Sequence, residues 1–134
     1  MKKNDINKFM KDILYNGGIA HPGVWPNVDP QGPVARPYFE VSFAVSNRVG
    51  AALAGGLVRE TGTMVVVVCV PQGDGETAAN NIADAVSDLF PQAMRIVIPG
   101  GLVTIQQPPS IEGGYPDDNN WRVPVKIRYT ASNR

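Results

Sequence analysis

Apolar side chains recur at helical spacing in two segments of the chain. The first is predicted to form a helix over 5–15, which Asn4 or Asp5 can cap and which "NGG" at 16–18 can end. Its apolar stripe consists of Ile6, Phe9, Met10, Ile13 and Leu14. The second stripe lies between Gly75 and Pro91 and predicts another amphipathic helix. It consists of Ala79, Ile82, Ala83, Val86, Leu89 and Phe90.

A period of two marks the strands. "YFEVSFAV" at 38–45 alternates apolar and polar positions and predicts a half-buried strand. "LVRETGTMVVVVCV" at 57–70 predicts a long strand whose second half is apolar on both faces, so we expect it to be central and covered on both sides. "MRIVI" and "LVTIQQ" predict two short strands around a "PGG" turn within 94–107.

The final strand is predicted at 121–130, in "WRVPVKIRYT". Its inward set is Trp121, Val123, Val125, Ile127 and Tyr129, and its outward set is Arg122, Lys126, Arg128 and Thr130. Pro124 lies on the outward face and lacks an N–H donor, which suggests either an edge strand or a bulge.

Three segments lack a clear period. Residues 17–37 hold five prolines and four glycines and predict an irregular surface segment, in which Trp25 is interpreted as an anchor. The Gly/Ala-rich stretch 46–57 predicts a mobile loop between two antiparallel strands, and 108–120 predicts a loop rich in Pro, Gly, Asp and Asn.

These elements predict an α+β fold in which two helices pack on a mostly antiparallel sheet of about four to five strands. The length of 134 residues suggests one domain over 1–134. We expect flexible ends at 1–4 and 131–134.

Composition narrows the function classes. Lys plus Arg equals Asp plus Glu, at 12 each, which argues against general binding to nucleic acid or to an anionic membrane. Cys69 is the single cysteine, so it cannot form an internal disulfide, and its place in the valine run predicts a buried side chain. No apolar run approaches the ~20 residues of a membrane span, and charges interrupt the N-terminal segment, so we expect a protein made and kept in the cytoplasm.

The corner "PQGDGETA" at 71–78 joins the valine-rich strand to the second helix and resembles a ligand-binding turn. A phosphate loop would need a lysine here, and an EF-type calcium loop would need more carboxylates than Asp74 and Glu76. We therefore interpret the corner as structural: its glycines allow a tight reversal and its acids suit a helix start. Scaffold anchors are predicted at Trp25, Pro71, Gly73, Asp74, Gly75 and Trp121.

No catalytic, cofactor or metal site is predicted. His21 is the only histidine, and no nucleophile motif accompanies it. Asp117 and Asp118 lie in a turn-forming context and are interpreted as a solvated hairpin loop. Arg48 and Arg59 flank the Gly/Ala stretch and are either solvated charges or contacts to a neighbour in an assembly.

Taken together, the order of these segments resembles the tail terminator-like proteins of long-tailed bacteriophages. The resemblance spans about residues 9–130 and rests on "WPN" after the first helix, then "ARPYFEVSF", "RETGTMVVVVCVPQGDG", "ADAVSDLF" and "WRVPVKIRY". It implies a non-enzymatic subunit of a hexameric ring that caps the tail tube, stops its polymerisation and offers a surface to the head connector. The implied partners are a second copy of the chain, the tail tube protein and the head–tail connector protein.

The resemblance also implies a location at the head-proximal end of the tail, reached by assembly in the host cytoplasm. Candidate contact residues for this role are Arg48, Leu53, Arg59, Arg122, Lys126 and Arg128. Two alternatives stay open: a head-side neck or tail completion protein, and a small ligand-binding or enzymatic domain that uses the surface around His21 and Trp25.

Overall fold

The fold comes from a computed structural model, which describes residues 3–19, 22–25, 36–50, 58–73 and 76–133, with the backbone alone at 45–46 and 48–50. The helices are α1 (Lys3–Tyr15) and α2 (Thr77–Asp88). The strands are β1 (Gly23–Val24), β2 (Tyr38–Gly50), β3 (Val58–Pro71), β4 (Arg95–Ile98), β5 (Gly101–Thr104), β6 (Ser110–Ile111), β7 (Tyr115–Asp117) and β8 (Asn120–Ser132).

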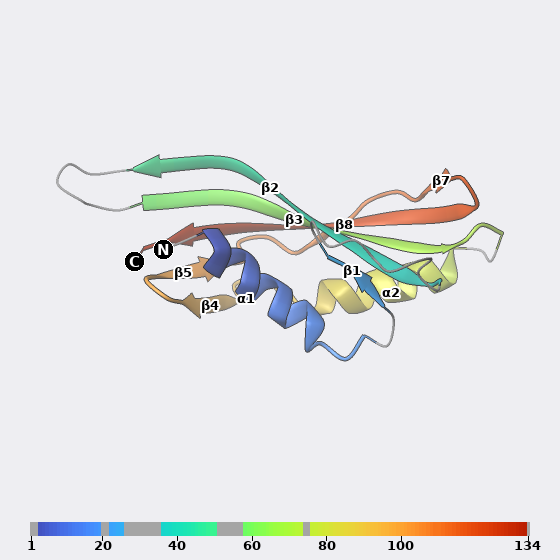
Figure 1. The fold of residues 1–134 in the computed structure, drawn as a ribbon, viewed down its shortest axis with the longest axis horizontal. Helices are drawn as coiled ribbons and strands as arrows, with labels where there is room; N and C mark the ends of the chain where they lie inside the picture. The colour runs from blue at the N-terminus through green and yellow to red at the C-terminus, as the bar shows by residue number, and fades with distance from the viewer. Residues whose placement is uncertain (1–2, 20–21, 26–35, 51–57, 74–75, 134) are drawn as a thin grey trace.

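All eight strands join one sheet in the order β1-β2-β3-β8-β5-β4, with β6 and β7 also paired to β8. Every pairing is antiparallel except β1 with β2, which is parallel. Both helices lie on the same side of the long strands β2, β3 and β8 (Figure 1). The predicted α+β class and its two helices therefore agree with the structure, whereas the sheet has more strands than the predicted four to five and is mixed.

The additional strands lie in segments that were predicted to be irregular. β1 falls within 17–37, and β6 and β7 fall within 108–120. The predicted loop at 46–57 is also partly wrong, because 46–50 belong to β2 and pair with β3 across a bulge between Val45 and Asn47. In all these places backbone pairing with a neighbouring strand organises a segment whose side chains carry no clear alternation. Residues 51–57, including Leu53, lie outside the described residues.

The core lies between the helices and the inner face of the sheet. The predicted stripes of both helices are buried or half-buried, with Ile6, Met10 and Leu14 fully enclosed on α1 and Ala79, Ala83 and Val86 on α2. α1 begins at Lys3, so Asn4 and Asp5 lie within its first turn instead of capping it. The described parts of both chain ends thus lie in regular structure: residues 3–4 in α1 and 131–132 in β8.

The central strand β3 is covered by helices on one face only, which corrects the prediction of cover on both sides. Met64, Val66, Val68 and Val70 point into the core and are fully buried. Val65 and Val67 point to the other face and are only half-buried. The register neighbours of the outer valines are Ser42 and Lys126 for Val65, and Glu40 and Pro124 for Val67. Neither helix lies on that face of the sheet.

β8 is an interior strand, so the edge-strand interpretation of Pro124 is wrong. β3 pairs along one side of β8, and β5, β6 and β7 pair in turn along the other. The Pro124 carbonyl accepts a 2.9 Å hydrogen bond from the Glu112 N–H, so its nitrogen also points to the β6 side. On that side Ile111 pairs with Val125 and Tyr115 pairs with Arg122. The residues 112–114 of the partner segment therefore lie opposite only 123–124 of β8. The partner segment thus has one extra residue opposite the missing donor, which fits the bulge alternative.

A buried ionic cluster ties the start of α1 to the sheet. Glu60 is 1% exposed, and its Oε2 accepts a 3.1 Å hydrogen bond from Lys3 Nζ. Lys3 Nζ also donates to the Tyr129 hydroxyl at 3.0 Å. Tyr129 in turn lies over Gly62, where an added Cβ would be 2.5 Å from the hydroxyl oxygen. The cluster holds one helix and two strands in a fixed relation at this end of the sheet.

Replacing Gly62 by Ala should destabilise the fold by about 1–3 kcal/mol, because its Cβ would meet Tyr129 and also lie 3.0 Å from the Ala44 carbonyl oxygen. Gly113→Ala is the matched control, since an added Cβ there meets nothing within 4 Å. Urea unfolding of the two variants beside the parent chain measures the difference. Equal midpoints for Gly62→Ala and Gly113→Ala would contradict the close approach of Tyr129.

Replacing Lys3 by Ala should cost about 1–3 kcal/mol, because it removes a charged hydrogen-bond donor 3.1 Å from the buried Glu60 carboxylate. Lys8→Ala is the control: Lys8 also pairs with a carboxylate, at 3.1 Å from Asp12, but both side chains are about half or more exposed. An exposed pair of this kind contributes about 0.5 kcal/mol or less. Thermal unfolding should therefore show a larger loss of stability for Lys3→Ala than for Lys8→Ala. Equal losses would contradict a larger contribution from the Lys3–Glu60 pair.

Candidate assembly surface

The sheet presents one face that neither α1 nor α2 covers. We call it the open face and define it by outward side chains of β2, β3 and β8. The strand register aligns them in rows, because β2 and β8 both pair antiparallel with β3. Its members are Glu40, Ser42, Arg59, Thr63, Val65, Val67, Arg122, Pro124, Lys126 and Arg128. Val65, Val67 and Pro124 form a half-buried apolar centre, with charged residues around it.

Arg122 organises the charges at one end of the open face. Its Nη1 donates to Glu40 Oε2 at 3.0 Å, and its Nε lies 2.8 Å from Asp117 Oδ2. The Nε–H is not directed at a hydrogen-bond acceptor, so the second contact is an ion pair only. The Arg122 side chain is 15% exposed, whereas both carboxylates are more open. One guanidinium thus joins β2, β7 and β8 across the face.

Burial raises the pKa values of two groups beside Arg122. Tyr38, Cys69 and Arg122 are register neighbours in one row across β2, β3 and β8. Burial raises the pKa of the Cys69 thiol, although the nearby Arg122 charge partly offsets this. Burial also raises the pKa of the Tyr38 hydroxyl. For Arg122, burial opposes the charge, but the ionisable Cys69 and the Glu40 hydrogen bond outweigh it and raise the guanidinium pKa.

The other end of the open face is more cationic. Lys126 Nζ lies 3.3 Å from Glu112 Oε1, and both side chains are about 40% exposed. Hydrogen bonds from Lys126 and Ser110 lower the pKa of the Glu112 carboxyl. Arg59 and Arg128 are exposed, and within the described part of the chain neither forms an ion pair.

The structure therefore gathers four of the six candidate contact residues, Arg59, Arg122, Lys126 and Arg128, on one face. Arg48 is the register partner of Glu60 on β2, and Leu53 is outside the described residues. The acidic partners Glu40, Glu112 and Asp117 were missed as site residues. Asp117 in particular was interpreted as part of a solvated loop, but it belongs to β7 and pairs with Arg122. The Arg122–Glu40 pair can be found only from the register, because its partners are 82 residues apart in sequence.

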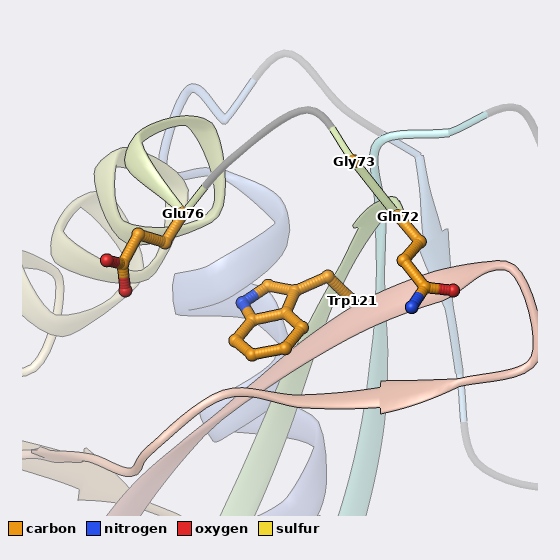
Figure 2. A pocket seen from close by; sticks show the side chains of 4 residues that line it. All are labelled: Gln72, Gly73, Glu76 and Trp121. Atoms are coloured by element: carbon orange, nitrogen blue, oxygen red, sulfur yellow. The ribbon is translucent and has the colours of Figure 1, made fainter.

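The corner between β3 and α2 is built around Trp121. Gln72 and Glu76 lie on either side of its indole, and with Gly73 these residues line a pocket of about 480 Å³ (Figure 2). The indole N–H is buried without a hydrogen-bond partner, and Gly114 passes so close that an added Cβ would lie 2.5 Å from the ring nitrogen. Gly73 has φ +100°, which favours glycine, and β3 ends at Pro71.

Of the two acids at this corner, only Glu76 lies within the described residues. Glu76 is the N-cap of α2, but its side chain makes no capping hydrogen bond, and Asp74 and Gly75 lie outside the described residues. Among the described lining residues none is cationic. Trp25 is half-buried against the core, with its ring centroid 5.9 Å from that of Phe39 and 6.3 Å from that of Tyr15.

The described residues contain neither a cluster of metal ligands nor a membrane-spanning helix. No group of three or more His, Cys, Asp or Glu side chains there is arranged to hold a metal ion. Among those same residues, neither helix is long and apolar enough to cross a membrane. His21 is outside the described residues.

Comparison with known proteins identifies the family. The model of the family described as phage tail terminator protein matches residues 7–129. Because this match covers most of the chain, the protein belongs to the phage tail terminator protein family. Membership gives it a structural role in a phage tail, and so in the virion. No curated protein sequence matches the chain.

Two solved structures share the fold. One, which has only a sequence identifier as its name, has a TM-score of 0.81 at 23% identity and covers 98% of this chain and 96% of its own. The other belongs to the virion of a native gene transfer agent particle, with a TM-score of 0.69 at 15% identity and 96% coverage of both chains. At these identities the two structures establish the fold alone.

Cys69 should react slowly with a thiol reagent in the native protein at pH 8. The side chain is fully buried, and a raised pKa leaves more of it as the unreactive protonated thiol at that pH. The same chain unfolded in guanidinium is the control and should react at the rate of a free cysteine. Equal rates in the folded and unfolded chain would contradict the burial of this sulfur.

Proposed function

We propose that the protein forms a ring of identical subunits that caps the head-proximal end of the tail tube, stops its polymerisation and offers the surface for head joining. The observation that carries the proposal is the family match over 7–129 on a fold whose two described helices cover only one face of the sheet. Contacts between two different surfaces of identical subunits produce a closed ring when the rotation closes.

The open face suits such a contact. Its apolar centre at Val65, Val67 and Pro124 is half-exposed in a single chain, so a neighbour that covers it removes apolar surface from water at about 25 cal/mol per Å². The surrounding ion pairs are partly exposed and leave charged groups available at the rim. An apolar centre with a charged rim is the usual anatomy of a protein–protein interface.

In this role the chain meets three partners: another copy of itself, the tail tube protein and the head–tail connector protein. Assembly takes place in the host cytoplasm, and the mature location is the head-proximal end of the tail. The proposed action is entirely structural and needs no cofactor. Trp25, which an enzymatic surface with His21 would use, instead packs between Tyr15 and Phe39.

The 134 residues are proposed to act as one domain, with the corner at 71–75 and the two tryptophans as scaffold. No described feature favours the neck or tail completion alternative over the terminator role. The two roles differ in their effect on tail length, which makes them separable by experiment.

Virions assembled without this protein should carry over-long tails without heads, as seen by electron microscopy, because nothing would stop the growth of the tube. Supplying the unaltered gene from a plasmid is the control and should restore tails of normal length. Tails of normal length without heads would instead indicate a neck or completion protein. Intact infectious particles would overturn both roles.

A further inference from the structure

We propose that the ring contact joins the exposed side of α2 in one copy to the cationic end of the open face in the next copy. This inference rests on the proposed ring and identifies the two surfaces that form it. The acidic surface, which we call the α2 stripe, consists of Glu76, Asn80, Asp84 and Asp88. The cationic surface consists of Arg59, Lys126 and Arg128 on β3 and β8.

The α2 stripe is a line of exposed side chains, of which three are acidic. Its four members follow one another at i, i+4 spacing, are all exposed, and therefore form one line along the side turned away from the core. α2 contains no basic residue. Asp84 and Asp88 repel each other at this spacing and lie near the negative end of the helix dipole. Within the described residues none of the three acids forms an ion pair.

The cationic surface has the complementary property. Arg59 and Arg128 are exposed, and within the part of the chain that the structure describes neither forms an ion pair, although the Arg128 charge contributes to the lowered pKa of Glu112. The Lys126–Glu112 pair is well exposed, so solvent screens it and Lys126 can take a second anionic partner. Among the described residues, the acids of the α2 stripe and the two arginines of the cationic surface therefore form no ion pair, and each surface carries the charge that the other could accept.

The spacing of the two sets matches. Along α2, a rise of about 1.5 Å per residue separates Asp88 from Asp84 by about 6 Å and Asp84 from Glu76 by about 12 Å. Along β8, about 3.4 Å per residue separates Lys126 from Arg128 by about 7 Å. Arg59 pairs with Ser132, so it lies about 14 Å further along the strand direction from Arg128. Asp88 can therefore meet Lys126, Asp84 can meet Arg128, and Glu76 can meet Arg59.

The two surfaces also lie on opposite sides of the molecule, because α2 packs against the inner face of the sheet (Figure 1). A contact between them is therefore head-to-tail and passes from copy to copy, as a ring requires. An alternative pairing of two open faces about a twofold axis along the strands would bring Arg59 and Arg128 of both copies together, and like charges disfavour it. A second copy is thus the occupant that the charges favour.

Charge reversal on one side at a time tests the contact. The acid-reversed variant carries Glu76→Lys and Asp84→Lys, and the base-reversed variant carries Arg59→Glu and Arg128→Glu. None of these four residues has an ion pair within the described chain, so the substitutions break none. The control variant carries Lys8→Glu and Arg95→Glu, two exposed bases outside both surfaces. Assembly is measured by light scattering and sedimentation, for the chain alone and with purified tail tubes.

Each reversed variant alone should assemble at least about tenfold more weakly than the unaltered chain, because like charges then face each other. An equimolar mixture of the two variants should recover assembly, since every contact in an alternating ring would again join opposite charges. The control variant should assemble normally. Higher salt should weaken assembly of the unaltered chain.

Two results would overturn the contact: reversed variants that assemble like the unaltered chain, or a folded pair of variants whose mixture fails to recover assembly. Circular dichroism of each variant establishes that it is folded. If the protein forms no ring at all, the result is different: the unaltered chain stays monomeric both alone and with tail tubes. That result would reject the proposed function together with the contact.

Discussion

The structure depends on the pairing of β3 with two long neighbours. β2 pairs along one side of β3 and β8 along the other, so that most of the β3 backbone is hydrogen-bonded within the sheet. This arrangement fixes which side chains point to the helices and which point away. Described helices cover one side only, and the outer valines are half-buried between the side chains of β2 and β8. The division of the molecule into a core side and an open side follows from this one arrangement.

The sequence predicted the elements in which burial is one-sided. The stripes of α1 and α2 and the alternation in β2 and β8 each reflect a single buried face, which leaves a periodic trace in the chain. β1, β6, β7 and the end of β2 were missed, because their backbones are held by a neighbouring strand while their own side chains carry no clear period. The cover of β3 was predicted wrongly for a related reason: an outward valine between Lys126 and Ser42 has the same sequence signature as a buried one.

The candidate surface was predictable only in part. Outward positions of β8 identified Arg122, Lys126 and Arg128 as surface charges, but not whether each had a partner. Arg122 proves to be held by Glu40 and Asp117, which are about 80 and 5 residues away from it in sequence. Arg128 lies two residues beyond Lys126 and forms no ion pair with any described residue. Arg122 thus holds the sheet together, whereas Arg128 is available to a neighbouring subunit. Which of these roles a charged residue has depends on the register of the strands.

The enclosed Cys69 has a consequence for any assembly that this protein builds. It is the only thiol in the chain, and it is sealed within the row of Tyr38 and Arg122. Neighbouring copies therefore have no sulfur with which to form a covalent link while they are folded. The cohesion of a ring would come entirely from reversible contacts, and it would be the same in the reducing interior of a host cell and in the oxidising medium that a released particle enters.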